Sequence, residues 1–415
     1  MPQAGRGADH RAYWLLQTIR QAGFDVDLIT GVSPRQDGSE IHALRGLVER
    51  ARIFPPDHGS WLRAAHAWMR GEPFIRTREW QDAMAQQVRE VGQGAALVVC
   101  VDAVHHQMIA PLLANKPRPF YLLDLGEPLS QRLITRATAQ RGLTAWALRS
   151  EAKLLRSLES AAANSADLAL VNDEIDLQIT ARRAPHASLW AVANGVNPTD
   201  GFSGDTITDL PNDVLFCGDL AIAAHQRAAV WLARTVMPLL RRHVPDARLV
   251  LMDYDLPKPI RRLGSLAWVE LIDRADGGVP EALRMSRCIV GVAPQRQARG
   301  AAERTLMMMA LARPVVCTSA VARTLPDETA AAPALAENGQ QIAEATRRML
   351  EDRKRAGHAG AQARRLVQQC GTWQQQWRRV GALLSQIASD ERVRVTSDSP
   401  DPRDLAELRS ATFTT

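Results

Sequence analysis

The sequence has 415 residues, a formal net charge of +6 and a pI near 9.4. That length exceeds one ordinary domain core and predicts two or three domains. Hydrophobic residues make up 46% and charged residues 23%, which is typical of a soluble globular protein, and no apolar run approaches the ~18–20 residues that a membrane-spanning helix needs. Charged side chains interrupt the first thirty residues, so we expect no secretory signal.

The cysteines and the type of basic residue narrow the class of protein further. Four of the five cysteines (Cys100, Cys217, Cys288 and Cys317) lie in apolar, strand-like segments, and no C-x-x-C pair occurs. This pattern predicts free thiols in a reducing cytoplasm and argues against a disulfide scaffold or a zinc module. The basic residues are almost all arginine, which we attribute to base composition, and no nucleic-acid motif is present, so we expect no nucleic-acid partner. The charge does favour anionic partners such as phosphates or a lipid surface.

Short apolar runs alternate with segments of helical period along the chain. The expected strands are Phe24–Thr30, Ala96–Asp102, Phe120–Leu125, Asp167–Asn172, Leu189–Ala193, Val214–Cys217, Arg248–Met252, Trp268–Ile272, Cys288–Val292 and Val315–Thr318. The expected helices between them include Ser150–Ala163, Ala223–Arg242, Glu303–Ala312 and Gln340–Glu351. Strands that alternate with helices predict an α/β protein with parallel sheets covered on both faces.

A polar stretch near the middle divides the chain into halves. Asn194–Leu210 is rich in the residues of turns and linkers. We expect a Rossmann-like domain over 1–195, a linker over 196–210, a second Rossmann-like domain over 211–371, an amphipathic helix over 372–388 and a disordered tail over 389–415. Ligands of doubly wound sheets bind at the carboxyl ends of the strands. We therefore expect the ligand of this chain in a cleft between the two domains.

Several motifs stand in a characteristic order in the second half of the chain. They are VANGVN (192–197), LFCGDL (215–220), VAPQRQARGAAERTLMMMALARPVVCT (292–318) and GTWQQQW (371–377), preceded by Glu151 and Glu159 at a spacing of eight. Together they resemble glycosyltransferases of the GT-B fold, family four, and within it the sugar transferases of bacterial exopolysaccharide clusters. The 292–318 block, which resembles "APLRxARGxxNKxLEAMAxGxPVVAT", is the most specific of these motifs.

The same block has the chemistry of a diphosphate site. An apolar strand leads into a loop with Arg296, Arg299 and Gly300, and a helix carrying Arg304 follows. A helix N-terminus and guanidinium groups suit a diphosphate, and glycine permits close backbone approach. The resemblance implies a nucleotide-diphosphate sugar as donor, with no metal and no cofactor, because arginines supply the charge. The alternative is that these arginines are solvated residues of an arginine-rich surface.

Three departures from the family pattern fall around this nucleotide site. Met307 stands where the family has the glutamate that binds the ribose hydroxyls, and a thioether accepts hydrogen bonds poorly. Arg304 replaces a lysine, and the glycine usual after the strand Arg248–Met252 is missing. This pattern leaves open a changed donor or an inactive site.

The amino-terminal half resembles the family only in places. GADHRAYWLL (7–16) resembles "GxxxRxxxLL", which implies that Gly5 and Gly7 approach the donor diphosphate. The family's strand before this loop is absent from the sequence, so we expect an upstream start or, as the alternative, a rebuilt domain.

Three further residues near strand ends are candidates for catalysis. His105 and His106 follow the strand Ala96–Asp102, where the resemblance implies a donor contact and the alternative is a loop or acceptor-side role. Asp124 would face the same cleft edge, or else cap a helix.

A helix after Ser60 could carry a separate function. Trp61, Leu62, Ala65, Trp68 and Met69 fall on one helical face beside basic residues. Such a face suits a peripheral membrane contact, whereas the alternative is a helix packed on its own sheet.

Taken with the resemblance, these features predict a retaining glycosyltransferase of bacterial surface polysaccharide synthesis. It would move a sugar from the nucleotide donor to a polysaccharide or lipid-linked saccharide, in the cytoplasm or on the inner face of the membrane. The alternative is a non-catalytic GT-B pseudoenzyme that acts as a binding or scaffold subunit.

Overall fold

The computed structural model describes residues 7–31, 44, 46–54, 60–75, 81–138, 140–197, 207–253, 256–273, 281–296 and 300–390. The chain forms two compact units, which we call unit 1 (Met1–Val192 with Trp377–Thr415) and unit 2 (Ala193–Gln376). Residues 391–415 of the expected tail lie outside the described residues. No helix in the described part of the chain is long and apolar enough to cross a membrane.

Unit 2 contains a six-stranded parallel sheet in the order β12-β11-β10-β7-β8-β9. Its strands are β7 (Asp213–Phe216), β8 (Arg248–Asp253), β9 (Val269–Asp273), β10 (Val290–Ala293), β11 (Val315–Cys317) and β12 (Ala334–Leu335). The chain winds outward from β7 to β9 on one side and then from β10 to β12 on the other. The strand order therefore reverses between β7 and β10, which is where doubly wound sheets bind ligands.

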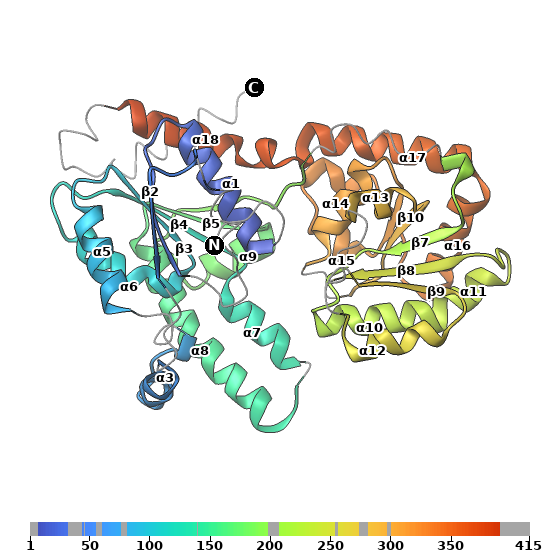
Figure 1. Ribbon diagram of the computed structural model, residues 1–415, viewed down its shortest axis with the longest axis horizontal. Coiled ribbons are helices and arrows are strands. Elements are labelled where there is room, and N and C mark those ends of the chain that lie inside the picture. The colour runs from blue at the N-terminus through green and yellow to red at the C-terminus, as the bar shows by residue number, and fades with distance from the viewer. Residues whose placement is uncertain are drawn as a thin grey trace. The chain divides into compact units, whose positions relative to one another are not determined.

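Helices cover both faces of this sheet (Figure 1). One face carries α10 (Ala223–Trp231), a π-helical segment (Leu232–Val236), α11 (Met237–Arg241), α12 (Lys258–Arg261) and α16 (Gly339–Glu351). The other carries α13 (Glu281–Ser286), α14 (Ala302–Ala310) and α17 (Arg353–Leu366), with the short α15 (Ser319–Ala322) after β11. Because side chains alternate along a strand, Leu249 joins the first hydrophobic cluster and Val250 joins the second.

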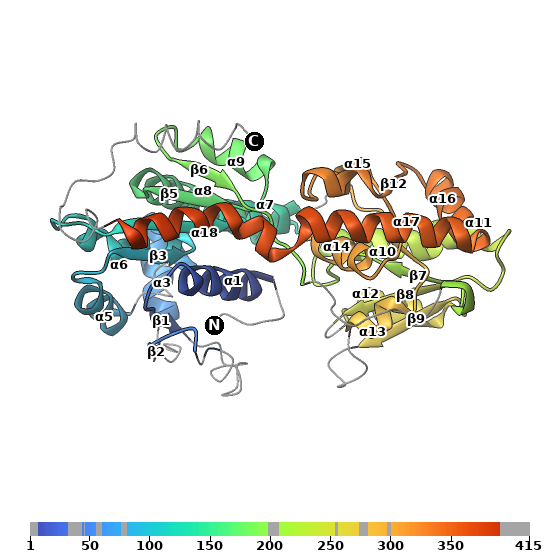
Figure 2. The same cartoon turned by 90° about the horizontal axis from the view of Figure 1, so that it is seen from above.

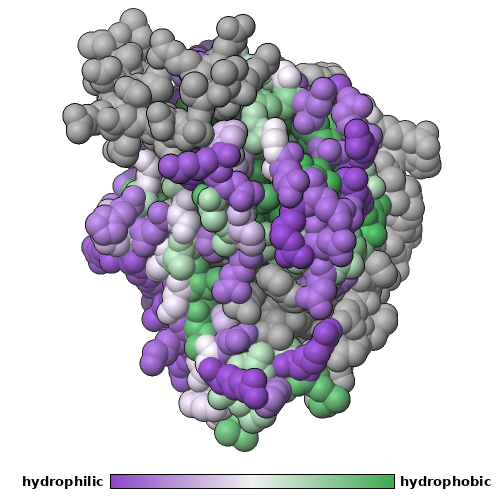
Figure 3. Space-filling view, turned by 90° about the vertical axis from the view of Figure 1, so that its left-hand side faces the viewer, coloured by the Kyte–Doolittle hydropathy of each residue, from purple (hydrophilic) through white to green (hydrophobic). Residues whose placement is uncertain are grey.

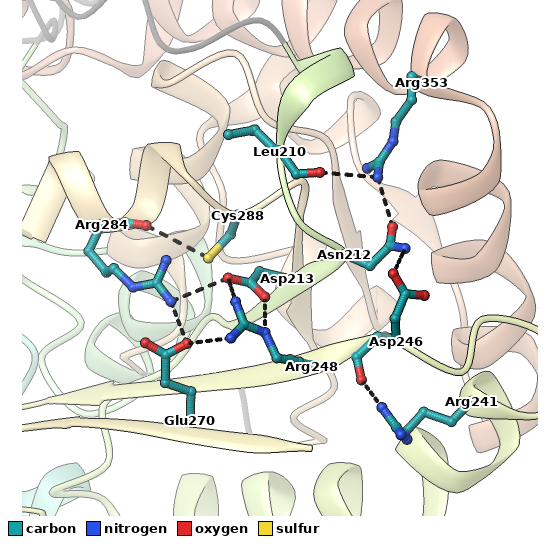
Figure 4. Close-up of polar contacts among 11 residues, drawn as sticks. Leu210, Asn212, Asp213, Arg241, Asp246, Arg248, Glu270, Arg284, Cys288 and Arg353 are labelled. Carbon is teal, nitrogen blue, oxygen red and sulfur yellow. Dashed lines mark hydrogen bonds and ion pairs between the residues drawn. The ribbon is translucent and has the colours of Figure 1, made fainter. Parts of the chain in front are cut away.

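An ion-pair cluster closes the amino end of the same sheet (Figure 4). Asp213, fully buried at the start of β7, accepts from Arg248 Nε at 2.8 Å and from Arg284 Nη2 at 3.3 Å. Arg284 Nη2 also donates to Glu270 at 2.6 Å. These charges satisfy one another at the edge opposite the carboxyl ends of the strands, so we assign them a structural role.

Unit 1 contains two separate parallel sheets. The larger runs β3-β4-β5-β6, with strands at Leu97–Val101, Phe120–Gly126, Leu168–Val171 and Leu189–Ala191. The smaller pairs β1 (Asp27–Gly31) with β2 (Arg50–Phe54). Within the described ranges no strand joins the two sheets. Correspondingly, β4 and β5 are buried throughout, whereas β1 and β3 are only partly buried.

The helices of unit 1 pack around these sheets. They are α1 (Gly7–Gln21), α3 (Ser60–Met69), α5 (Asp82–Gly92), a 3-10 turn (Ala103–His105), α6 (His106–Leu113), α7 (Leu129–Thr138), α8 (Gly142–Ser165) and α9 (Glu174–Ala181). The last helix, α18 (Trp373–Ser389), buries Trp377, Val380 and Leu384, which confirms the predicted apolar stripe. Figure 2 shows α1 lying alongside α18, and an ideal Cβ on Gly381 would lie 3.4 Å from Thr18 Cγ2.

A close backbone contact within unit 2 explains why VANGVN has a glycine at position 195. An ideal Cβ on Gly195 would lie 2.3 Å from the backbone nitrogen of Trp373, a distance that no side chain tolerates. The neighbouring Val196 forms a parallel bridge with Thr372 and accepts a hydrogen bond from the Trp373 N–H at 3.4 Å. The motif therefore joins the segment after β6 to the start of α18.

All ten expected strands are present, with ends shifted by a few residues. The largest shift is at β1, which begins at Asp27 rather than Phe24. The sequence analysis missed β2, in which two of the five residues are arginine, and β12, which has two residues.

Candidate functional site

Two loops meet where the strand order of unit 2 reverses. The loop after β7 contains Gly218, and the loop after β10 contains Gln295 and Gly300. An ideal Cβ on Gly218 would lie 2.3 Å from Gln295 Nε2, and one on Gly300 would lie 2.8 Å from Ile222 Cδ1. Gly300 also has φ +81°, a conformation that favours glycine. Both glycines therefore favour the close approach of these loops, because a side chain at either position would displace Gln295 or Ile222.

Gln295 holds the strand ends at this edge together. Its side chain is buried, and Nε2 donates to the Cys217 carbonyl at the end of β7 at 2.6 Å. The backbone carbonyl of Gln295 accepts a hydrogen bond from Oγ1 of Thr318, which follows β11, at 2.6 Å. Within the described part of the chain, the buried Oε1 of Gln295 has no hydrogen-bond partner. Residues 297–299, which follow it in the loop, lie outside the described residues.

Arg304 on α14 is bound by carboxylates. Its Nη2 lies 3.1 Å from Asp253 Oδ1 at the end of β8, and its Nε lies 3.3 Å from Glu281 Oε1 at the start of α13. Nη1 donates to the Gly218 carbonyl. Burial disfavours the charged guanidinium, but the two carboxylates outweigh this effect and raise the pKa of Arg304. The side chain is only 14% exposed, so its charge is balanced within the protein.

Further carboxylates surround this arginine. Burial, and then the negative charge of Glu281 and that of Asp219, raise the pKa of Glu303, while Arg304 lowers it. Asp219 is positioned by its backbone N–H, which donates to His225 Nδ1 at 3.0 Å. The described part of the site is therefore more acidic than the arginine-rich sequence predicts.

The remaining residues predicted for donor binding have different surroundings. Arg296 is exposed at the end of the β10 loop, and Arg299 lies outside the described residues. Met307 on α14 is partly buried and packs against the hydrophobic cluster of α14, β10 and β11. The diphosphate roles of Arg296, Arg299, Gly300 and Arg304 and the ribose position of Met307 stay predictions.

In unit 1, Asp124 is engaged by Arg11. Asp124 is a buried residue of β4, and Arg11 lies on α1. Arg11 Nε donates to Oδ1 at 2.9 Å and to Oδ2 at 3.0 Å, and Nη2 donates to Oδ1 at 2.8 Å. Asp124 lies within a strand, so the alternative of a helix cap is wrong. Its catalytic role stays a prediction, although both carboxylate oxygens already accept hydrogen bonds.

The two predicted histidines have different environments. His106 begins α6, is buried, and places Nδ1 3.1 Å from the Tyr121 hydroxyl, with the two rings stacked. Burial lowers the pKa of His106. His105 ends the preceding 3-10 turn and is partly buried. Of the predicted glycines, Gly7 begins α1 and Gly5 lies outside the described residues.

The sequence analysis missed Asp102, which lies three residues before His105. Its backbone at φ 73° and ψ 146° is in a region that only glycine adopts easily. Burial, and then the charge of Glu159, raise the pKa of Asp102 to about 7, while the N–H groups of Val104 and Ala103 oppose the rise. Its position directly after an apolar strand was the available signal for a site residue. Asp253 and Glu281, which bind Arg304, could be found only from the fold.

Metal ligation has no support in the described ranges. They contain no group of three or more His, Cys, Asp or Glu side chains that could hold a metal ion.

Comparison with known proteins gives one family match, which falls in unit 2. Residues 211–352 match the family model described as "Glycosyl transferases group 1". The match includes the Gly218 and Gly300 loops and Arg304. No curated protein matches the sequence.

Solved structures match nearly the whole chain at low identity. Sucrose-phosphate synthase from Thermosynechococcus elongatus has a TM-score of 0.63 and 15% identity and covers 93% of this chain and 95% of its own. Anabaena Alr3699/HepE in complex with UDP and glucose has a TM-score of 0.59 and 14% identity, with coverage of 93% and 97%. TarM has a TM-score of 0.62 and 9% identity, with coverage of 92% and 97%. The fold is therefore GT-B, as the sequence predicts.

Proposed function

We propose that this protein is a retaining glycosyltransferase that uses a nucleotide-diphosphate sugar. The observation that carries the proposal is the pair of glycine loops at the strand reversal of unit 2, inside the segment that matches the glycosyltransferase model. Gly218 and Gly300 bring the backbone to the place where doubly wound sheets bind ligands. The GT-B fold and the family match support a transferase of this class.

The donor chemistry is proposed from the similar structures and the loop. HepE was solved in complex with UDP and glucose, and an S. aureus TarM variant was solved with UDP and alpha-GlcNAc-glycerol among its ligands. In this chain, Arg296, Arg299 and the amino end of α14 would stabilise the diphosphate leaving group. The charge needed at that group would come from these residues, with neither a metal nor a cofactor.

The candidates for catalysis in unit 1 are not equivalent. His106 contacts Tyr121 and Asp124 contacts Arg11, whereas His105 is partly buried at the end of a turn. A donor contact is proposed for His105 and His106, which follow the carboxyl end of β3.

The acceptor and the location complete the proposal. The acceptor would be a polysaccharide or a lipid-linked saccharide of bacterial surface polysaccharide synthesis. The reaction would take place in the cytoplasm, with peripheral contact to the inner face of the membrane. Helix α3 is the segment that the sequence offers for that contact.

One set of observations favours a non-catalytic GT-B subunit instead. Met307 cannot replace a ribose-binding carboxylate, and the charge of Arg304 is already balanced by Asp253 and Glu281. A Met307→Glu variant separates the two functions. A decayed nucleotide site should gain affinity from the restored carboxylate, whereas a site reshaped for a different donor should keep or lose affinity.

Calorimetric titration of the full chain with UDP, GDP and ADP tests the donor site. We expect binding to one of the three nucleotides, and a loss of about tenfold in Arg299→Ala, because a charged hydrogen bond is removed. Arg365→Ala is the matched control, because Arg365 is an exposed arginine on α17. This variant should bind the nucleotide like the parent. A folded protein that binds none of the three nucleotides would overturn the donor site.

A further inference from the structure

Large hydrophobic side chains gather at one end of unit 1. Leu62 and Met69 on α3 are 62% and 73% exposed, and Leu143 and Trp146 at the start of α8 are 84% and 57% exposed. These four are among only seven large hydrophobic residues that are exposed in the described part of the chain, so the exposure is concentrated. We call them the apolar tip.

The two helices of the apolar tip lie side by side. The rings of Trp68 on α3 and Trp146 on α8 meet edge to face, with centroids 5.6 Å apart. The sequence analysis considered α3 alone. The structure adds the first turns of α8, where Leu143 and Trp146 lie.

Buried contacts hold the apolar tip in place. The carboxylate of Glu151 on α8 is buried and accepts from the backbone N–H groups of Phe74 and Ile75, each at 3.0 Å. These two residues follow α3. Ala64 and Ala145 are also buried, so each helix packs one face inward, while the four residues of the apolar tip face outward. The exposed side chains thus extend from a fixed base.

The charges beside the apolar tip are mostly positive. His66 and Arg70 near the end of α3 are exposed, as are Arg141, Arg149 and Lys153 around the start of α8. Helix α3 has no acidic residue, the only one in 142–153 is the buried Glu151, and the partly buried Glu72 follows α3. Hydrophobic and hydrophilic residues alternate at the lower end of the unit 1 face in Figure 3, the end to which α3 extends in Figure 1.

We infer that the apolar tip docks on the surface of an anionic phospholipid bilayer. Leucine, methionine and tryptophan side chains would enter the interface, and the surrounding basic residues would pair with lipid phosphates. A second copy of the chain fits less well, because a two-fold contact would bring the same positive charges together. The inference rests on the peripheral contact of the proposed function and gives that contact a surface, two helices and a lipid class.

Vesicle co-sedimentation of the full chain, without any nucleotide, tests this inference. We expect binding to vesicles of equal parts phosphatidylglycerol and phosphatidylcholine, and much weaker binding to phosphatidylcholine alone. Leu143→Ala should lower the partition coefficient about tenfold through lost apolar contact. Arg149→Gln should lower it about fivefold, as expected for one basic residue near an anionic surface.

Ile175→Ala on α9 is the matched control, because Ile175 is an exposed hydrophobic residue of unit 1 outside the apolar tip. It should bind vesicles like the parent. Circular dichroism of each variant checks that it is folded. Equal binding to both vesicle types, or no effect of Leu143→Ala, would overturn the inference, as would sedimentation velocity showing lipid-free self-association that Leu143→Ala abolishes. Nucleotide titration of Leu143→Ala should match the parent, so a failure of the lipid surface is distinguishable from a failure of the donor site.

Discussion

Arg11 and Asp124, which are 113 positions apart, form a buried ion pair that fastens helix α1 to strand β4. Arg11 also donates from Nη1 to the Val192 carbonyl at 2.6 Å, and its guanidinium lies 5.0 Å from the ring centroid of Trp377 on α18. One side chain thus links the first helix, a central strand, the segment after β6 and the last helix. The arginine of "GxxxRxxxLL" therefore has a structural function in this chain.

Removal of Asp124 should destabilise unit 1. Asp124→Ala leaves the charge of Arg11 buried and uncompensated, which we expect to lower the free energy of unfolding by about 3–5 kcal/mol in urea denaturation. The control is Asp25→Ala. Asp25 pairs at the surface with Arg20, which lies on α1 as Arg11 does, and such a surface pair contributes less than about 1 kcal/mol. If Asp124→Ala kept its stability and lost only transfer activity, Asp124 would be catalytic instead.

The carboxylates around Arg304 should limit donor affinity. Glu281→Gln removes one partner of Arg304 and one negative charge near the proposed diphosphate site. We expect nucleotide affinity to rise about fivefold, as for one weak ion pair. Calorimetric titration measures the change. The control is Glu344→Gln, because Glu344 is a partly exposed glutamate that pairs with Arg347 on α16. A loss of affinity in Glu281→Gln would show that Arg304 must be held in place to bind.

Asp102 should make unfolding depend on pH. Its pKa is raised from 3.8 to about 7 in the folded protein, first by burial and then by Glu159. Between these two values the unfolded chain releases a proton that the folded chain retains. A rise in pH therefore lowers the free energy of unfolding in this window. The contribution of Asp102 is lost by about pH 7 and is regained as the pH falls toward 4.

Urea denaturation at several pH values compares the parent with Asp102→Asn. The stability difference between the two should change with pH in this window. A constant difference across the same pH range would contradict the raised pKa. Glu159, whose pKa is also raised by burial, stays in both proteins, so the difference between them reports Asp102 together with its coupling to Glu159.

The cysteines should be almost inert in the folded protein. Cys100, Cys217, Cys288 and Cys317 are buried, and burial raises the pKa of Cys100, Cys288 and Cys317 to about 12. Titration with dithiodipyridine should therefore detect at most one fast thiol, Cys370, and all five in denaturant. Cys370→Ser should abolish the fast phase. Fast reaction of several thiols in the native protein would mean that the strands of the core open readily.

The strands were predictable because parallel sheets buried on both faces need continuous apolar runs. Val214–Cys217 and Arg248–Met252 are such runs, and both are strands of unit 2. Strand β2 could not be found this way, because Arg50 and Arg52 interrupt it at an open sheet where the side chains are only partly buried.

The site was predictable in its backbone and less so in its charges. Gly300 and Arg304 were placed at the correct strand end because a glycine loop followed by a helix is a local pattern. Asp253 and Glu281 are 51 and 23 positions from Arg304, so only the fold brings them to it. Asp124 was predicted to face a cleft edge because it lies near the end of an expected strand. Its distant partner, Arg11, could not be found from local sequence.

The division of the unit 1 strands into two sheets has a consequence for local opening. A two-stranded sheet has few hydrogen bonds and little buried area of its own, so β1 and β2 should separate from the unit without unfolding β4 and β5. Amide hydrogens of Asp27–Gly31 should then exchange with deuterium much faster than those of Phe120–Gly126. Among the strands of unit 1, β1 and β2 should be the first that a protease cuts under native conditions.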